Sequence, residues 1–330
     1  MTADLARDTI FVTVAGSHAQ GFARAESDVD LHGICVVPLA ERLSLFRNFE
    51  QWSGVVPEPL RAKVDAALAE HPSTRHAADA KHECLVFEVA KFLRLCASAN
   101  PNALELLFAD PRDWLLTTPA FERIHGQRHR FLTKQVGQTF AGYAKSQLRR
   151  IGTHRSWLLN PPAEKPRRED FGLPGTGTLA REDRDAIEQE LVVPGMQLPA
   201  EVLAVLRAER SYRAAMRHYD AYETWKATRN PARAALERTH GYDTKHAMHL
   251  VRLLLTGIEV LETGDLQTRR RDVERLAAIR DGAWTFDELL AEVEKLDARC
   301  AVALASSTLP EAADRQFVDD LAVRTMLAFR

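Results

Sequence analysis

Residues 16–37 read GSHAQGFARAESDVDLHGICVV and closely follow an apolar, β-branched run, Ile10–Val14. That run is typical of a buried strand, so Gly16-Ser17 is expected at the turn where the strand ends. Glycine lets the backbone approach a ligand closely. Free N–H groups at the start of a helix, together with a serine hydroxyl, suit the phosphates of a nucleotide. The Gly-Ser pair therefore predicts a phosphate-binding turn.

Two carboxylates follow on what the pattern predicts to be the next strand. Apolar Val29 and Leu31 alternate with Asp28, Asp30 and His32. This period of two places both aspartates on one face of a strand, where they suit a hard divalent cation. A Gly-Ser pair or an Asp-x-Asp alone is most often a solvated turn. The two together, between apolar strands, predict a joined nucleotide and metal site.

The complete pattern G-S-x3-G-x5-S-D-x-D-L resembles the signature of the DNA polymerase β-like nucleotidyltransferase superfamily. In that superfamily the two acids and a third on a later strand hold two Mg²⁺ ions, which clamp the triphosphate and activate the attacking hydroxyl. The resemblance implies two Mg²⁺ ions, with Mn²⁺ as a substitute, and an NTP as substrate. Such catalysis consists mainly of in-line positioning and charge neutralisation, because charge spreads over the phosphorus oxygens in the transition state.

The third carboxylate is expected beside the next strand-like run, Cys84–Phe87. Period-two alternation puts Glu83 and Glu88 on opposite faces of that strand. We favour Glu83 as the catalytic and metal-binding acid, because it lies at the strand start and resembles the acidic residue of related chains there. Glu88 stays an alternative, since it could be a first-turn carboxylate of a helix expected over Val89–Cys96. Asp79 is a more distant alternative.

Four further stretches resemble one branch of the superfamily, the RNA repair pathway DNA polymerase β family. They are Lys91–Phe108, Phe140–Ile151, His154–Pro174 and Gly241–Leu254. The similarity runs from about Ile10 to about Leu266. It implies transfer of a nucleotide from an NTP, with RNA as the acceptor. One departure is His18, where many members of the superfamily have a larger basic or aromatic residue.

A helix expected over Thr239–Glu262 carries three candidate nucleotide-binding residues. Lys245, His249 and Arg252 fall at i, i+4 and i+7 on one face of that helix. A face with three potential cations could close over a triphosphate. The alternative is a solvated basic stripe on a capped helix.

A second long helix, expected over Phe131–Ile151, lies in a basic segment. Between Glu122 and Arg155 there are eight Lys or Arg against one acid, a local excess of +7. This excess could steer RNA toward the acidic site or grip the triphosphate, whereas a solvated helix face is the alternative. Within the segment, Lys145 and Tyr143 could meet the base or ribose of the nucleotide, although packing and exposure explain them equally well.

Composition narrows the class of protein. The 330 residues are 45% hydrophobic and 27% charged, with a net charge of −2, which argues against a globally basic nucleic-acid binder. No uncharged run approaches the length of a membrane span, and the N-terminus MTADLARD lacks the pattern of a signal peptide. We therefore expect a cytoplasmic protein without a membrane partner. Its four cysteines form no CxxC pair and are expected to be buried thiols.

The kind of element is expected to change near Pro111. Before it, three strands are expected together with helices near Pro59–Ala69 and Val89–Cys96. After it the hydrophobic periodicity is mostly helical, including Arg269–Ile279 and Phe286–Leu304.

The patterns and the resemblance together predict an α+β protein of two domains. A small mixed-sheet nucleotidyltransferase domain is expected over residues 1–112, and a larger α-helical domain over 113–330 supplies NTP and acceptor contacts. The expected reaction moves an NMP from an NTP to an acceptor hydroxyl, with RNA as the acceptor in repair or 3′-end modification. Alternatives are AMP transfer to a protein or small molecule, and a non-catalytic, antitoxin-like scaffold. The intact Ser17, Asp28 and Asp30 argue against the scaffold.

Overall fold

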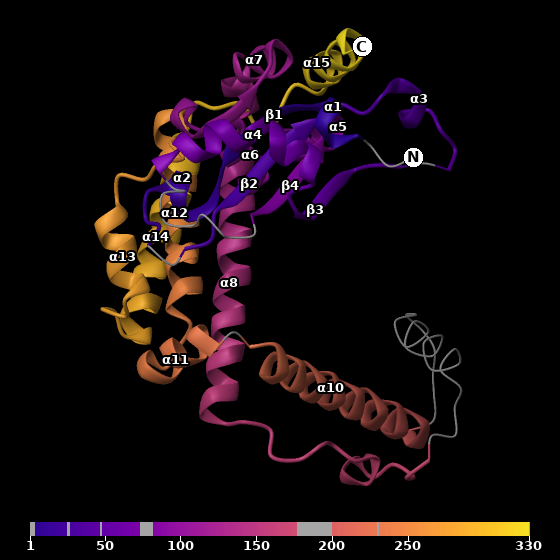
Figure 1. Ribbon diagram of the computed structural model, residues 1–330. Coiled ribbons are helices and arrows are strands. Elements are labelled where there is room, and N and C mark those ends of the chain that lie inside the picture. Colours follow the sequence, from indigo (N-terminus) through magenta and orange to yellow (C-terminus); the bar gives the residue numbers. More distant parts are fainter. Residues whose placement is uncertain are drawn as a thin grey trace. The chain divides into compact units, whose positions relative to one another are not determined.

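A computed structural model of the protein describes residues 4–24, 27–46, 48–72, 82–176, 200–229 and 231–329 (Figure 1). The chain divides into two compact units. Unit 1 comprises Met1–Ile151 together with Thr244–Arg330, and unit 2 comprises Gly152–Asp243. The boundary expected after residue 112 falls inside unit 1, because the C-terminal helices pack in the same unit as the sheet.

Unit 1 is built on a mixed five-stranded sheet with the strand order β3-β4-β2-β1-β5. The strands are β1 (Thr9–Val14), β2 (Asp30–Cys35), β3 (Gln51–Val55), β4 (Glu83–Glu88) and β5 (Trp114–Thr117). β2 and β4 pair in parallel, and the other neighbouring pairs are antiparallel. This sheet, followed by a helical C-terminal part, confirms the predicted α+β class.

One face of the sheet is covered by α4 (Glu58–Glu70). Leu60, Val64 and Leu68 recur every four residues, so they form one apolar stripe along that helix. The stripe packs into a buried cluster with side chains of β1, β2 and β4, among them Leu31 and Cys84. Residues that alternate with these along the strands therefore lie on the opposite face of the sheet.

The opposite face carries α5 (Val89–Ala97), α6 (Pro101–Leu107) and α7 (Pro119–His125). The Phe11 ring of β1 stacks on Phe121 of α7, with ring centroids 3.5 Å apart. Asn100 caps α6 by accepting a hydrogen bond from the Ala103 N–H, as its place before Pro101 suggests. These helices pack on the part of this face that is distant from Asp30 and Glu83, the first residues of β2 and β4.

Several of the remaining helices of unit 1 pack around α12 (Thr244–Thr263), whose side chains are mostly buried. A Cβ on Gly257 would lie 3.0 Å from Phe140, so α12 and α8 (Gln135–Leu159) approach closely there. α13 (Val273–Arg280) and α14 (Phe286–Ser306) also pack on α12, and α15 (Arg315–Ala328) packs on α5. Shorter elements are α1 (Leu5–Asp8), α2 (Gly16–Gln20), α3 (Leu39–Arg42), η2 (Pro111–Asp113) and η3 (Arg128–Phe131).

Unit 2 contains the end of α8 with η4 (Arg168–Phe171), α10 (Ala200–Thr228) and α11 (Pro231–His240). Its aromatic side chains gather around Trp157, which donates a hydrogen bond of 2.8 Å to His218 and packs against Trp225. Arg168 forms an ion pair with Glu209, which fastens the η4 segment to α10.

Several elements differ from the expectations. The short strands β3 and β5 and the helix α15 were not predicted. The helix expected over Thr239–Glu262 is broken, because Gly241 has a φ of +76° and α12 begins only at Thr244. The helix expected from Arg269 begins at Val273, and the residues before it are not helical.

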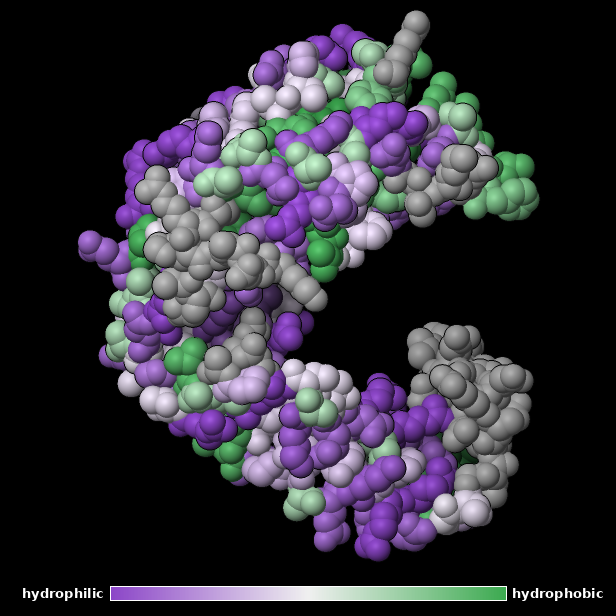
Figure 2. Space-filling model, viewed as in Figure 1, coloured by the Kyte–Doolittle hydropathy of each residue, from purple (hydrophilic) through white to green (hydrophobic). Residues whose placement is uncertain are grey.

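The cysteines are buried, whereas some large hydrophobic side chains are exposed at the surface. All four cysteines are free and buried, as expected. Figure 2 shows hydrophobic side chains at the surface near α3, where Leu45 and Phe46 are almost fully exposed. Within the described residues, no helix combines the length and apolar character needed to cross a membrane.

Candidate functional site

The turn after β1 lies directly against the first residue of β2. The Ala15 N–H donates a hydrogen bond of 2.8 Å to the Asp30 carbonyl oxygen. Gly16 follows with a φ of +62°, and a Cβ on it would lie 2.6 Å from Asp30 Oδ2. Only glycine fits this position, because any side chain would displace the carboxylate and strain the backbone.

The short helix α2 presents its first residues beside that carboxylate. It ends at Gly21, whose left-handed conformation lets its N–H bond the Ser17 and His18 carbonyl oxygens. His18 lies 3.2 Å from the Ser27 carbonyl oxygen through Nε2, so the chain that returns toward β2 is held against α2. The turn at Gly16-Ser17 and the acidic strand β2 thus form one local structure.

A buried polar network holds α2 from behind. Gln20 donates a hydrogen bond of 2.9 Å to one Glu105 oxygen, and the other oxygen pairs with Arg252 of α12. The Arg270 N–H also donates to the Gln20 carbonyl oxygen, at 3.1 Å. Gln20 and Arg252 are 4% and 6% exposed, so this network fixes α2 to the helical part of unit 1.

The register of the sheet brings two predicted acids together. Asp30 and Glu83 are direct partners in the parallel pairing of β2 with β4. Paired residues of neighbouring strands point to the same face, and the next residues, Leu31 and Cys84, belong to the core beneath α4. Asp30 and Glu83 therefore lie side by side on the face away from α4, and Glu83 is exposed.

Negative charge accumulates at this end of the sheet. Burial raises the pKa of Asp30, and the neighbouring negative charge of Asp28 raises it further, while Lys245 and His18 oppose the shift. Among the described residues, none of Asp28, Asp30 and Glu83 takes part in an ion pair. Asp28 and Glu83 thus lie next to Asp30, with Lys245 and His18 nearby, and carboxylate oxygens are the donors that a hard divalent cation prefers.

Glu88 lies at the other end of β4, where it pairs with Cys35 of β2. Its carboxylate caps α5 by accepting a hydrogen bond of 2.8 Å from the Ala90 N–H, and it forms an ion pair with Arg42. At 4% exposure it is buried and fully engaged. The geometry therefore favours Glu83 over Glu88 as a neighbour of Asp30; Asp79 lies outside the described residues.

The predicted nucleotide-binding residues are dispersed. Lys245, at the start of α12, lies close enough to Asp30 to lower its pKa. His249 is half-buried one turn further along the helix, and Arg252 is buried against Glu105. Lys145 of α8 lies 3.4 Å from Asp297 of α14 and has no described contact with the carboxylates. Of these four residues, the structure brings only Lys245 to the acidic centre.

Sequence reasoning assigned no role to His32 or Gln20, which support the site. His32 lies two residues after Asp30 on the same face of β2. Burial lowers its pKa, and the nearby Glu105 opposes this shift. The alternation of polar residues along β2 could have indicated that His32 shares a face with Asp30. No sequence pattern indicates the role of Gln20, since its partner Glu105 is 85 residues away.

Unit 2 holds a separate group of metal-ligating side chains. His154, Glu237 and Asp243 each offer one donor atom, and these atoms lie within 4.8 Å of one another. Such a trio could hold a metal ion. Arg229 forms an ion pair with Glu237, so part of the negative charge there is already balanced.

Comparison with known proteins agrees with this geometry. Residues 3–158, just under half of the 330, match the family model described as RNA repair pathway DNA polymerase beta family. This range includes all five strands, α2 and the three carboxylates. No curated protein and no solved structure matches the chain. Over this N-terminal part, the chain is similar to the RNA repair pathway DNA polymerase beta family, whose name indicates polymerase β-like nucleotidyltransferases.

Proposed function

We propose that the protein is a Mg²⁺-dependent nucleotidyltransferase that moves an NMP from an NTP to a hydroxyl of RNA. The observation that carries the proposal is the pairing of Asp30 with Glu83 directly beside Gly16. A phosphate-binding turn and an acidic centre must be adjacent for the triphosphate to bridge them, and a Cβ on Gly16 would lie 2.6 Å from Asp30 Oδ2.

Asp28, Asp30 and Glu83 are the residues that would hold the metal. Their donors are all carboxylate oxygens, which Mg²⁺ prefers, and the pKa of Asp30 stays raised although Lys245 and His18 oppose the shift. When bound, Mg²⁺ or Mn²⁺ neutralises charge on the phosphate oxygens and lowers the pKa of a coordinated hydroxyl. The acidic centre would otherwise repel a triphosphate.

The residues around the centre then have distinct tasks. The N–H groups of Gly16 and Ser17 and the Ser17 hydroxyl bind the phosphates, and Lys245 adds a positive charge from α12. The acceptor oxygen forms a bond to the α-phosphorus while the bond to pyrophosphate breaks. Glu83 accepts the proton of the acceptor hydroxyl. His249 lies one turn behind Lys245 and lines the same side of α12.

Arg252 and Lys145 have other tasks in this proposal. Arg252 acts through Glu105 and Gln20 to position α2, so it is a positioning residue rather than a ligand of the triphosphate. Lys145 belongs to the contact between α8 and α14.

The test is incorporation from each of four α-³²P-labelled NTPs with Mg²⁺, with and without a short RNA that carries a 3′-hydroxyl. The intact protein should label the RNA, whereas Asp28→Asn/Asp30→Asn should not. Asp287→Asn/Asp319→Asn removes the same charge at exposed positions and should keep the activity. Label on the protein itself or on an added protein would favour AMP transfer. Binding of NTP without labelling of either kind of acceptor would contradict the proposal.

A further inference from the structure

A second polar pocket lies in unit 1, on the other side of β1 from the carboxylates. It has a volume of about 570 Å³. Its walls come from the segment before β5, from the region between α7 and η3, and from the non-helical segment 265–271 before α13. The pocket therefore joins parts of the chain that are far apart in sequence.

The pocket and the acidic centre open at the same end of the sheet. β5 runs antiparallel to β1, so β5 begins where β1 ends, beside the turn that contains Gly16. Gly21, at the end of α2, contacts Arg269 of the pocket wall, since a Cβ there would lie 3.6 Å from Arg269 Cγ. α2 has five residues and spans about 7.5 Å. The pocket thus begins one short helix away from the phosphate-binding turn.

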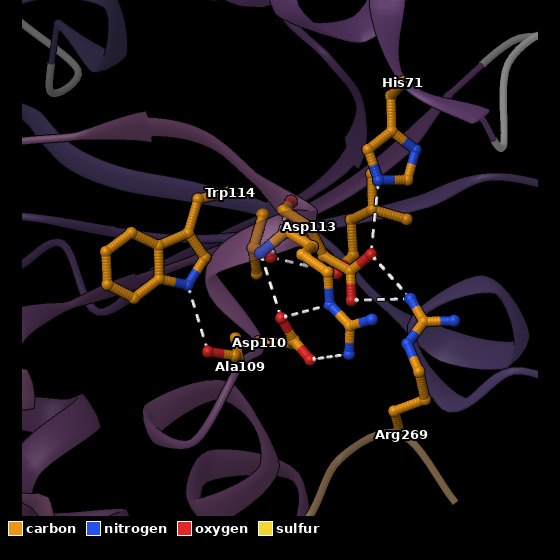
Figure 3. Close-up of polar contacts among 9 residues, drawn as sticks. His71, Ala109, Asp110, Asp113, Trp114 and Arg269 are labelled. Carbon is orange, nitrogen blue, oxygen red and sulfur yellow. Dashed lines mark hydrogen bonds and ion pairs between the residues drawn. The ribbon is translucent and has the colours of Figure 1, made fainter.

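Arginine dominates the lining of the pocket. The cationic side chains are Arg112, Arg128, Arg269, Arg270 and Arg271, against two carboxylates, Asp110 and Asp265. Three of the arginines already have carboxylate partners: Arg112 pairs with Asp110, Arg269 with Asp113, and Arg270 with Glu259 and Asp272. Figure 3 shows buried Asp113, which does not itself line the pocket, held between His71 and Arg269.

Arg128 and Arg271 differ from those three. Neither forms an ion pair with a carboxylate among the described residues. The Arg128 guanidinium lies 5.6 Å from the centroid of the Phe108 ring and donates a hydrogen bond to the His125 carbonyl oxygen. Arg271 is exposed. One guanidinium is thus held in place over an aromatic ring, and the other is available at the rim.

The environment of His125 agrees with an excess of positive charge. Burial, followed by the charges of Arg128 and His129, lowers the pKa of His125 to about 4. The imidazole is therefore neutral at pH 7 and can accept or donate a hydrogen bond without adding charge. A polar pocket with two uncompensated guanidiniums and an aromatic floor suits a phosphate group attached to a nucleoside.

We propose that Arg128 and Arg271 bind a backbone phosphate of the RNA acceptor in this pocket, while the hydroxyl of the RNA lies at the carboxylates. This inference rests on the proposed function, because it names where the acceptor strand lies. It also explains how a chain with a net charge of −2 can bind a polyanion next to an acidic centre.

The test measures fluorescence anisotropy of a labelled single-stranded RNA 12-mer with the full chain at several salt concentrations, without NTP. Arg128→Gln/Arg271→Gln should weaken binding about tenfold and reduce the slope of log K against log salt by about 0.7 to 1, because one phosphate contact is lost. The control, Arg94→Gln/Arg324→Gln, removes two exposed arginines elsewhere in unit 1 and should bind as the wild type does.

Unchanged affinity and slope in Arg128→Gln/Arg271→Gln, or no RNA binding by the wild type, would overturn the inference. Equilibrium dialysis of Mg²⁺–ATP tests whether the variant is folded, because the proposed nucleotide site should be retained in it. If the variant lost ATP binding but kept RNA binding, the pocket would bind free nucleotide and the inference would be wrong. The two proposals can fail separately. If no label is transferred but the variant loses RNA affinity, only the transferase proposal fails.

Discussion

The two ends of β4 carry the same amino acid in opposite circumstances. Glu83 is exposed, lies beside Asp30 and has no ion-pair partner among the described residues. Glu88 is buried, caps α5 and pairs with Arg42. A buried carboxylate with all its oxygens engaged contributes to stability. An unpaired carboxylate in a group of acids opposes folding instead, through repulsion between like charges.

The same contrast separates other acidic residues of unit 1. Glu105 is matched by Arg252 and Gln20. Burial raises the pKa of Asp113, but Arg269 and His71 oppose the shift and hold the carboxylate in place. Asp28 and Asp30 have no comparable partner. The balance of charge therefore distinguishes structural from candidate catalytic carboxylates more sharply than residue type does.

The largest effect is expected for Asp30→Asn. It should lower kcat/KM about 10³-fold, because a ligand of a catalytic metal contributes several kcal/mol in the transition state. The midpoint of thermal unfolding should not fall, since the change removes a negative charge that burial and Asp28 oppose. Labelled incorporation and calorimetry measure the two effects. A lower unfolding midpoint in the variant than in the wild type would contradict the contrast between Asp30 and the paired carboxylates.

Glu83→Gln should be the next largest. Loss of the proposed base should lower kcat about 10²-fold, without lowering the unfolding midpoint, because Glu83 is exposed and unpaired among the described residues. The measurement is single-turnover incorporation at saturating NTP. Full activity in this variant would remove Glu83 from the site.

Glu88→Gln should have the opposite profile. Loss of the ion pair with Arg42 and a weaker cap on α5 should lower the free energy of unfolding by about 2 kcal/mol. Activity per folded molecule should be unchanged, since Glu88 lies at the far end of the strand from Asp30. Urea unfolding and incorporation below the transition test both parts. An inactive but stable variant would reverse the assignments of the two glutamates.

Gly16→Ala tests how tightly the backbone fits the acidic end. We expect a loss of roughly 1 to 2 kcal/mol in stability from the left-handed backbone, and weaker NTP binding because the added methyl group displaces Asp30. Gly142→Ala, in α8 with open space around it, is the matched control and should stabilise the protein by about 0.5 to 1 kcal/mol. Equal effects at the two glycines would contradict the close contact.

The smallest effect is a pH dependence at the unpaired end. The pKa of Asp30 is raised in the folded state, so ionisation of Asp30 opposes folding. Its favourable contribution exists below the ordinary pKa of aspartate and is lost as the pH rises through the raised value. The stability of the wild type relative to Asp30→Asn should therefore decrease as the pH rises from below 3.8 to neutral, while Mg²⁺ affinity of the wild type increases. Calorimetry and Mg²⁺ titration across this range provide the check.

The local part of the site could be predicted from sequence. Gly16, Asp28 and Asp30 lie within one strand-turn-strand segment, so spacing and alternation were sufficient to bring them together. Alternation also put Glu83 and Glu88 on opposite faces. The parallel register with β2 then distinguishes them further, because Glu83 pairs with Asp30 and Glu88 pairs with Cys35. That register depends on strand pairing across the sheet, which no local pattern contains.

The remaining features depend on contacts between distant residues. Arg252 fits a basic helix face in the sequence, but Glu105, 147 residues away, occupies it. β3 was missed because it is a short edge strand with exposed residues and a glycine. β5 has only four residues. The arginine pocket could not be foreseen, because its walls come from three separate segments.

The division into units affects the order in which parts of the nascent chain can fold. Unit 1 is interrupted by residues 152–243, and α12, which carries both Lys245 and Arg252, comes after this interruption. A nascent chain can form the sheet early, but α2 receives its support from Arg252 only when the C-terminal third has been made. Contacts across so long a separation form late and slowly. The proposed nucleotide site is therefore expected to be among the last parts of the protein to mature on the ribosome.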